Sequence, residues 1–260
     1  MMMTPVVRML LIMNVGVFLL EATGVNLIDR FGLRSVLSPA FAPYQFVTHM
    51  FLHAGFMHLF SNMLGLFVFG PMLERVWGSN RFLFFYFFTG IGAGLLFSGI
   101  NYYETSELRD SVMVFNAGPS PEALQNFLYR NSPSLLAEFD NFLNAFEDNP
   151  GDSAYIRGSI KIVNSYYAQQ VNIPMVGASG AIFGILMAFG LLFPNTELFL
   201  LFPPIPIKAK YLVAFYGAYE LYSGVYRTQS DNVAHFAHIG GMLFAFILVR
   251  YWNTQRKNFY

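Results

Sequence analysis

The sequence predicts an all-α polytopic membrane protein with six transmembrane helices and one large extramembrane insertion between the third and the fourth. Of 260 residues, 55% are hydrophobic and only 12% are charged, whereas about a quarter are charged in a soluble domain. Six stretches are long and apolar enough to cross a bilayer, which takes roughly 17 to 25 helical residues. Aromatic residues make up 18% of the chain, which suits packed membrane helices with aromatic side chains near their ends.

These stretches divide the chain into three parts. The predicted spans lie near residues 5–21, 55–73, 81–100, 174–193, 209–226 and 232–252. Residues 1–100 then contain spans one to three with a long first loop, and residues 101–173 form an extramembrane insertion that we expect to be partly helical. Residues 174–260 contain spans four to six and a short cytoplasmic tail. No small-residue cleavage pattern follows the first span, so we expect a retained anchor rather than a secretory signal.

The basic residues of the short loops predict the orientation. Eight of them fall on the side of the two termini and three on the opposite side, and positive residues concentrate on the cytoplasmic side. We therefore expect an integral multi-pass protein of a bacterial inner (cell) membrane, with cytoplasmic N- and C-termini and the insertion on the outer face.

The insertion has its own pattern. Its apolar residues recur at threes and fours, which predicts one or two amphipathic helices broken at Pro133. Residues 101–172 hold nine acidic and four basic residues, a net charge of −5. Two hypotheses stay open: the insertion filters substrates by charge, or it is a tolerated surface insertion without a catalytic role.

Composition also excludes several kinds of chemistry. The chain has no cysteine, so disulfides, thiolate catalysis and cysteine-ligated metals are excluded. Its net charge is zero, which gives no indication of a nucleic-acid partner. No histidine is followed by glutamate, so the H-E-x-x-H zinc motif is absent. We expect no metal and no cofactor.

A few polar residues lie inside the predicted spans, where polar groups are costly and often functional. Spans two, four and six enter from the same face, and four of these residues lie near the starts of those spans. Ser179 follows Pro174, the predicted start of span four, and His238 follows Asn232, the predicted cap of span six, each by about 8–9 Å of helix. The four residues that share this depth are His58, Asn62, Ser179 and His238.

This set suits acyl transfer. A serine becomes a nucleophile when a neighbouring histidine takes its proton, and imidazole, amide and backbone N–H groups stabilise an oxyanion. Small residues at positions 177, 180, 184 and 188 of span four, and at 241 and 245 of span six, predict a close approach of these two helices. Glu220 in span five is interpreted either as a residue that snorkels to the interface or as a latch to a neighbouring polar group.

Other interpretations of the same residues stay open. A lone serine in a membrane helix more often packs or bonds the backbone. His235 and His238 would equally suit a haem or metal site in an electron carrier or transporter.

Three linked motifs resemble the rhomboid intramembrane serine proteases. They are HAGFMHLFSN at residues 53–62, GASG at residues 177–180 and AHFAHIGG at residues 234–241. The resemblance covers about 44–100 and 174–250 and leaves 101–172 unexplained. It implies a six-transmembrane-helix rhomboid-like bundle that cleaves transmembrane helices of substrate proteins near the outer membrane face.

The resemblance also implies roles for single residues. Ser179 is then the nucleophile and His238 its general base, a dyad without an acid, with His58, Asn62 and the Ser179 N–H as the oxyanion hole. Gly177, Gly180 and Gly241 support the site, while His53, His235 and the Glu74-Arg75 pair are structural. The implied partners are the lipid bilayer and transmembrane-helix protein substrates. The alternative is a protease-inactive rhomboid-like protein that binds membrane helices, although such a relative is expected to lack the serine or the histidine.

Overall fold

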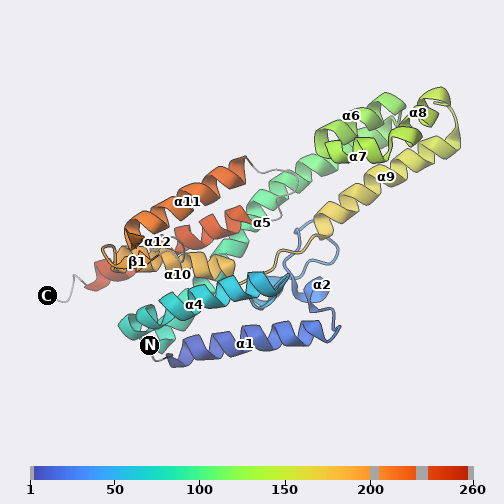
Figure 1. The fold of residues 1–260 in the computed structure, drawn as a ribbon. Helices are drawn as coiled ribbons and strands as arrows, with labels where there is room; N and C mark the ends of the chain where they lie inside the picture. Colours follow the sequence, from blue (N-terminus) through green and yellow to red (C-terminus); the bar gives the residue numbers. More distant parts are fainter. Residues whose placement is uncertain (1–2, 200–204, 227–233, 257–260) are drawn as a thin grey trace. The chain divides into compact units, whose positions relative to one another are not determined.

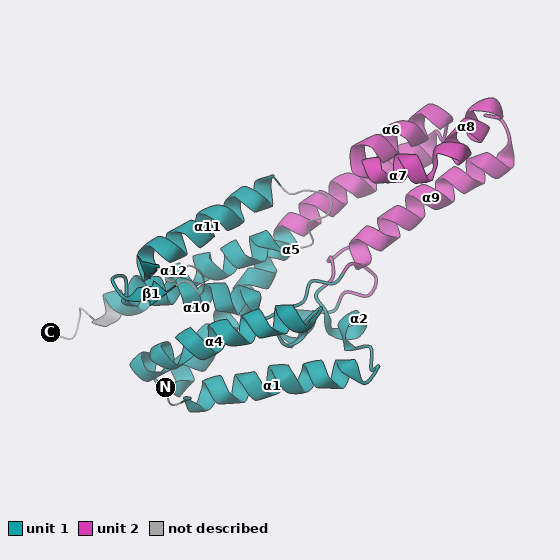
Figure 2. Cartoon of the chain, viewed as in Figure 1, with its two compact units in different colours: residues 1–33, 42–99, 174–260 teal, residues 34–41, 100–173 magenta. Residues whose placement is uncertain are grey.

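The structure of the chain is a computed structural model that describes residues 3–199, 205–226 and 234–256 (Figure 1). It divides into two compact units, which Figure 2 colours separately. The first unit contains residues 1–33, 42–99 and 174–260, and the second contains residues 34–41 and 100–173. The second unit thus includes a short piece of the first loop as well as the predicted insertion.

The first unit is built from long apolar helices. They are α1 (Pro5–Ala22), α4 (Phe56–Trp77), the first part of α5 (Ser79–Ala117), α10 (Ser179–Leu192), α11 (Ala209–Val225) and α12 (His235–Arg256). Among the described residues, α1, α4 and α5 are long and apolar enough to cross a membrane, and α10 is a shorter apolar helix. The protein is therefore a helical membrane protein, while the count of six spans stays a prediction.

Short elements connect these helices. The first loop holds α2 (Leu27–Phe31), α3 (Gln45–Thr48) and the 3₁₀ helix η1 (His49–Phe51). Strand β1 (Glu197–Phe199) pairs antiparallel with β2 (Pro206–Lys208), with Glu197 opposite Lys208. This hairpin lies between α10 and α11 in the chain.

The structure shows where α10 and α12 begin. Helix α10 begins at Ser179, so the prediction of a start at Pro174 is wrong. Met175 instead forms an antiparallel bridge with Leu33, and Gly177 has φ +125°, which no α-helix permits. Helix α12 begins at His235, and the predicted cap Asn232 lies outside the described residues.

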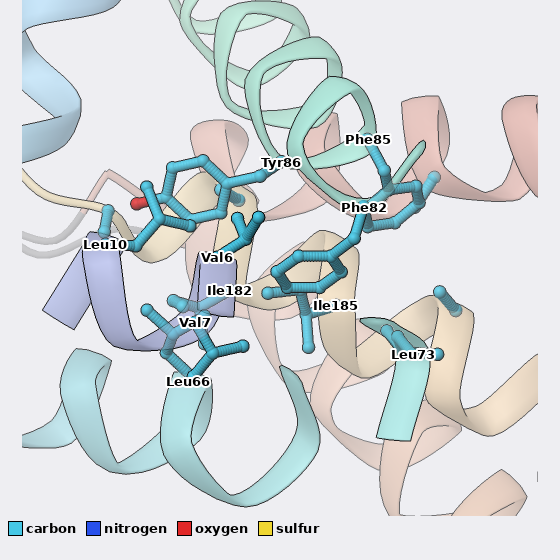
Figure 3. Packing of buried hydrophobic residues seen from close by; sticks show 14 of the residues in the cluster. Val6, Val7, Leu10, Leu66, Leu73, Phe82, Phe85, Tyr86, Ile182 and Ile185 are labelled. Atoms are coloured by element: carbon cyan, nitrogen blue, oxygen red, sulfur yellow. The ribbon is translucent and has the colours of Figure 1, made fainter. Parts of the chain in front are cut away.

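Large apolar side chains fill the space between the helices of the first unit. Val7 of α1, Leu66 of α4, Phe82 and Tyr86 of α5 and Ile185 of α10 are all fully buried in one cluster (Figure 3). Because lipid is as apolar as these side chains, close packing rather than the hydrophobic effect holds such helices together.

A buried carboxylate ties α1 to α4. Glu74, near the end of α4, accepts hydrogen bonds of 3.0 Å from the backbone N–H groups of Val6 and Val7. Ser79 Oγ donates to the same carboxylate at 2.7 Å. The first N–H groups of a helix have no partner within it, so Glu74 caps α1 from a neighbouring helix and complements the positive end of its dipole.

The second unit has a separate core. The end of α5 packs with α6 (Pro121–Asn131), α8 (Asp140–Asp148) and α9 (Ser153–Asn172) around Phe115, Leu128, Phe146 and Val163. Helix α7 (Pro133–Glu138) starts at the proline that we predicted as a break, since proline suits the first helical position. Ser38 Oγ donates to Asn172 Oδ1 at 2.6 Å, which holds residues 34–41 within this unit.

Replacement of Glu74 by alanine is expected to lower the free energy of unfolding by about 2–3 kcal/mol, because buried N–H groups lose a charged acceptor. Thermal unfolding in detergent micelles measures the change. Glu147→Ala, at an exposed position of α8, is the control and should leave stability within about 0.5 kcal/mol. Equal stability of the two variants would contradict the capping role.

Candidate active site

Ser179 is the first residue of α10. Ile182 N–H donates a hydrogen bond of 3.0 Å to the carbonyl oxygen of Ala178, the residue just before the helix. The N–H groups of the first turn, Ser179 among them, therefore lack intrahelical acceptors, as at any helix start. Such a terminus favours negative charge, so the serine hydroxyl lies where a developing anion is stabilised.

His238 lies in the first turn of α12 and meets Ser179. Its Nε2 is 2.9 Å from Ser179 Oγ, a distance within the normal range for a hydrogen bond. The histidine is buried, with 8% of its surface exposed. The two residues are 59 positions apart in the chain, so only the packing of α10 against α12 brings them together.

Gly241 permits that packing. A Cβ atom at Gly241 of α12 would lie 1.9 Å from the carbonyl oxygen of Gly180, so the two backbones touch. The predicted close approach of these helices is present, but not all of the small residues serve it. A Cβ at Gly180 would meet Ala93 of α5 at 2.4 Å, and one at Gly184 would meet Thr89 of α5 at 2.8 Å. Gly177 precedes the helix altogether.

Gly177 lies against His58. A Cβ atom there would be 2.7 Å from His58 Nε2 and 3.6 Å from Ser179 Oγ, so the imidazole of His58 lies beside the residue two positions before Ser179. The positive φ of Gly177 also disfavours any residue with a side chain. The His53 ring packs against the His58 ring at a T-shaped angle, with 5.1 Å between centroids.

Asn62 lies one turn after His58 on the same side of α4. It is buried, with 4% of its surface exposed, and its Nδ2 has no hydrogen-bond partner within the described part of the chain. A buried amide without an acceptor is uncommon and calls for an explanation. An anion formed during a reaction would be such an acceptor.

Glu220 of α11 completes the cluster, and of its two interpretations the structure supports the latch to a neighbouring polar group. Its carboxylate is buried, with 5% of the residue exposed, so it does not snorkel to the interface. Glu220 Oε2 lies 2.8 Å from His238 Nδ1 and 2.6 Å from His235 Nδ1. The expected dyad without an acid therefore has an acid within hydrogen-bonding distance of its histidine.

Glu220, His235 and His238 are also the one group of histidine and acidic residues, among the described residues, whose ligand atoms lie close enough together to hold a metal ion. Their spacing fits hydrogen bonds better. Two ligand atoms on a tetrahedral zinc lie about 3.3 Å apart, since each is roughly 2.0–2.1 Å from the metal. The oxygen-to-nitrogen distances of 2.6 and 2.8 Å are shorter than this.

Comparison with known proteins identifies the family. The Rhomboid domain model matches residues 40–121 and 154–253, most of the chain. The chain belongs to the rhomboid family. Only residues 122–153 separate the two matched segments, so the rhomboid match extends further into both ends of the insertion than the motifs alone indicated.

Two curated relatives share parts of this sequence. Rhomboid-like protein 11, chloroplastic, of Arabidopsis thaliana is 38% identical over 91 residues, which cover 31% of this chain and 32% of the relative. Putative rhomboid protease YdcA of Bacillus subtilis (strain 168) is 46% identical over 48 residues, 18% of this chain and 24% of the relative. The chain thus matches about a third and a quarter of the lengths of these relatives.

Two contacts of this rhomboid site were not predicted from the sequence. Phe183, one turn after Ser179, stacks on the His238 ring with 4.1 Å between centroids and 8° between planes. The spacing of four along one helix could have indicated that Phe183 lies near Ser179, but not that its ring meets one from another helix.

His49 of the first loop is the second unpredicted contact. Its carbonyl accepts the Gly177 N–H at 2.9 Å, which holds the non-helical segment before Ser179. Its ring Nδ1 lies 2.8 Å from the Gln45 carbonyl, and burial lowers the pKa of His49 to about 4. The ring is therefore neutral at pH 7, so its Nδ1–H donates to Gln45 without a buried charge.

Gly177→Ala is expected to lower the free energy of unfolding by about 1–3 kcal/mol, because the added Cβ strikes His58 and the backbone is strained. Thermal unfolding in detergent micelles measures the change. Gly16→Ala on α1, where a Cβ meets nothing within 4 Å, is the matched control and should not be destabilised. A Gly177→Ala variant as stable as this control would refute the assigned contact.

Proposed function

We propose that the protein is an intramembrane serine endopeptidase that cleaves transmembrane helices of substrate proteins. The observation that carries the proposal is the 2.9 Å contact between Ser179 Oγ and His238 Nε2. Family membership supports it, since one relative bears the name of a putative rhomboid protease. The protease-inactive alternative has less support, because both residues of the pair are present and in contact.

The proposed reaction begins with proton transfer. As Ser179 Oγ attacks the scissile carbonyl carbon, its proton passes to His238 Nε2, and the carbonyl oxygen becomes an oxyanion. The His238 imidazolium then gives that proton to the leaving amine, which departs and leaves an acyl ester on Ser179. Water attacks the ester with His238 again as base, and the carboxylic acid product leaves.

The oxyanion hole in this proposal consists of His58, Asn62 and the Ser179 backbone N–H. The unpartnered Nδ2 of Asn62 and the free N–H groups at the start of α10 are donors without acceptors among the described residues. Preorganised donors of this kind stabilise charge that develops only in the transition state.

The length of α10 supports cleavage below the membrane surface. Its 14 residues rise about 21 Å, less than the roughly 30 Å of a hydrocarbon core. A helix that starts at Ser179 and ends near the opposite interface therefore begins within the bilayer. We place the site near the outer face of a bacterial inner membrane, with cytoplasmic termini, and assign transmembrane helices as substrates because only a segment that unwinds exposes its carbonyl groups.

Ser179→Ala and His238→Ala are each expected to lower turnover by about 10³-fold or more, and the double variant should lose no more than either single one. Cleavage of a model transmembrane substrate, with labelling of Ser179 by a serine-directed phosphonate, measures this. Size-exclusion chromatography checks that the variants stay folded. Substantial turnover by either single variant would refute the assignment of nucleophile and base.

His58→Ala and Asn62→Ala are expected to lower kcat by about 10²- to 10³-fold with little change in KM, because oxyanion donors act on the transition state. Steady-state kinetics separates the two constants. Ser61→Ala, at the exposed neighbour of Asn62, is the control. A rise in KM at unchanged kcat would assign the two residues to substrate binding instead.

A further inference from the structure

We propose that Glu220 is a positioning residue that holds His238 as the base, so that Ser179, His238 and Glu220 form a triad. This inference rests on the proposed protease function and goes beyond the dyad that the motifs imply. Glu220 lies on α11, outside all three motifs.

The hydrogen bonds assign the tautomer of His238. An ionised carboxylate only accepts hydrogen bonds, so the 2.8 Å contact of Glu220 Oε2 requires a proton on His238 Nδ1. A neutral ring then has its lone pair on Nε2, the atom 2.9 Å from Ser179 Oγ. This is the tautomer that can take the serine proton. Without an acceptor at Nδ1, nothing in this cluster would select it.

His235 supports the carboxylate rather than the serine. Its Nδ1 donates to the same Oε2 at 2.6 Å, and the residue is 4% exposed. An isolated buried carboxylate costs several kcal/mol, and two imidazole donors on one oxygen offset this cost. This bond accounts for the position of the His235 ring beside Glu220.

Phe183 and Glu220 restrain different motions of His238. The stacked Phe183 ring restricts tilting of the imidazole plane, and the Nδ1 bond restricts rotation within that plane. A base must keep its nitrogen within about 2.6–3.2 Å of the hydroxyl oxygen to take the proton. With both restraints, the ring has one orientation that meets Ser179.

The three triad residues lie on three different helices. Ser179 belongs to α10, Glu220 to α11 and His238 to α12. Contact between α11 and α12 is thus a requirement for a correctly held base, and a movement of α11 that breaks the bond would leave His238 free to change tautomer.

The test uses the full-length enzyme in detergent with Glu220→Gln, Glu220→Asp and, as a matched control, Glu197→Gln at an exposed position of β1. Glu220→Gln is expected to lower kcat by about 10²- to 10⁴-fold with KM changed less than about threefold. The phosphonate labelling rate of Ser179 should fall in parallel, because labelling needs the base but no substrate binding. Glu220→Asp should recover part of the rate, and the control should match wild type.

A spectroscopic measurement reports the tautomer of His238 in the wild-type enzyme itself. With ¹⁵N-labelled histidine, and His238→Ala to assign the signal, His238 should be protonated at Nδ1 in wild type. In Glu220→Gln this population should decrease. A wild-type His238 protonated only at Nε2, or a Glu220→Gln enzyme within threefold of wild-type kcat, would overturn the proposal.

Two further outcomes distinguish failure of the proposed function from failure of the triad alone. If wild type neither cleaves substrate nor reacts with the phosphonate, the proposed function fails and the triad with it. If EDTA abolishes activity and wild type, but not Glu220→Gln, contains one zinc per chain, the cluster is a metal site and the triad is overturned. Activity unchanged by EDTA is the expected result.

Discussion

The contact between the backbones of α10 and α12 is the constraint on which the site depends. Gly241 approaches the Gly180 carbonyl so closely that no side chain fits between them. His238 is three residues before Gly241 and Ser179 is directly before Gly180, so one contact between backbones sets the distance between two side chains. A larger residue at Gly241 would separate the helices and, with them, the serine from the histidine.

Next to this contact, short non-helical segments fix where α10 begins. The bridge between Leu33 and Met175 and the bond from Gly177 N–H to the His49 carbonyl hold the segment before α10 in a non-helical conformation. Because this segment is not helical, α10 starts at Ser179. The N–H groups of its first turn therefore lie beside the Ser179 hydroxyl. The first loop thereby contributes to the site through its backbone, although its side chains carry no part of the proposed chemistry.

The second unit has a hydrophobic core of its own. The chain leaves the first unit after residue 99 and returns at residue 174, five residues before Ser179. Between these points, Phe115, Leu128, Phe146 and Val163 form an apolar cluster separate from that of the first unit. A unit with its own core can be accommodated in a connection because long insertions add little to the entropy of closing a loop.

Sequence alone determined the membrane class, the helical character and the residue types of the site, because hydropathy, small-residue spacing and three short motifs are local patterns. It predicted His58, Asn62, Ser179 and His238 together through their shared depth. Only the tertiary structure decided the start of α10, the stacking of Phe183 and the place of Glu220. A carboxylate in a span looks the same in sequence whether it snorkels or binds a histidine, because its environment comes from a different helix.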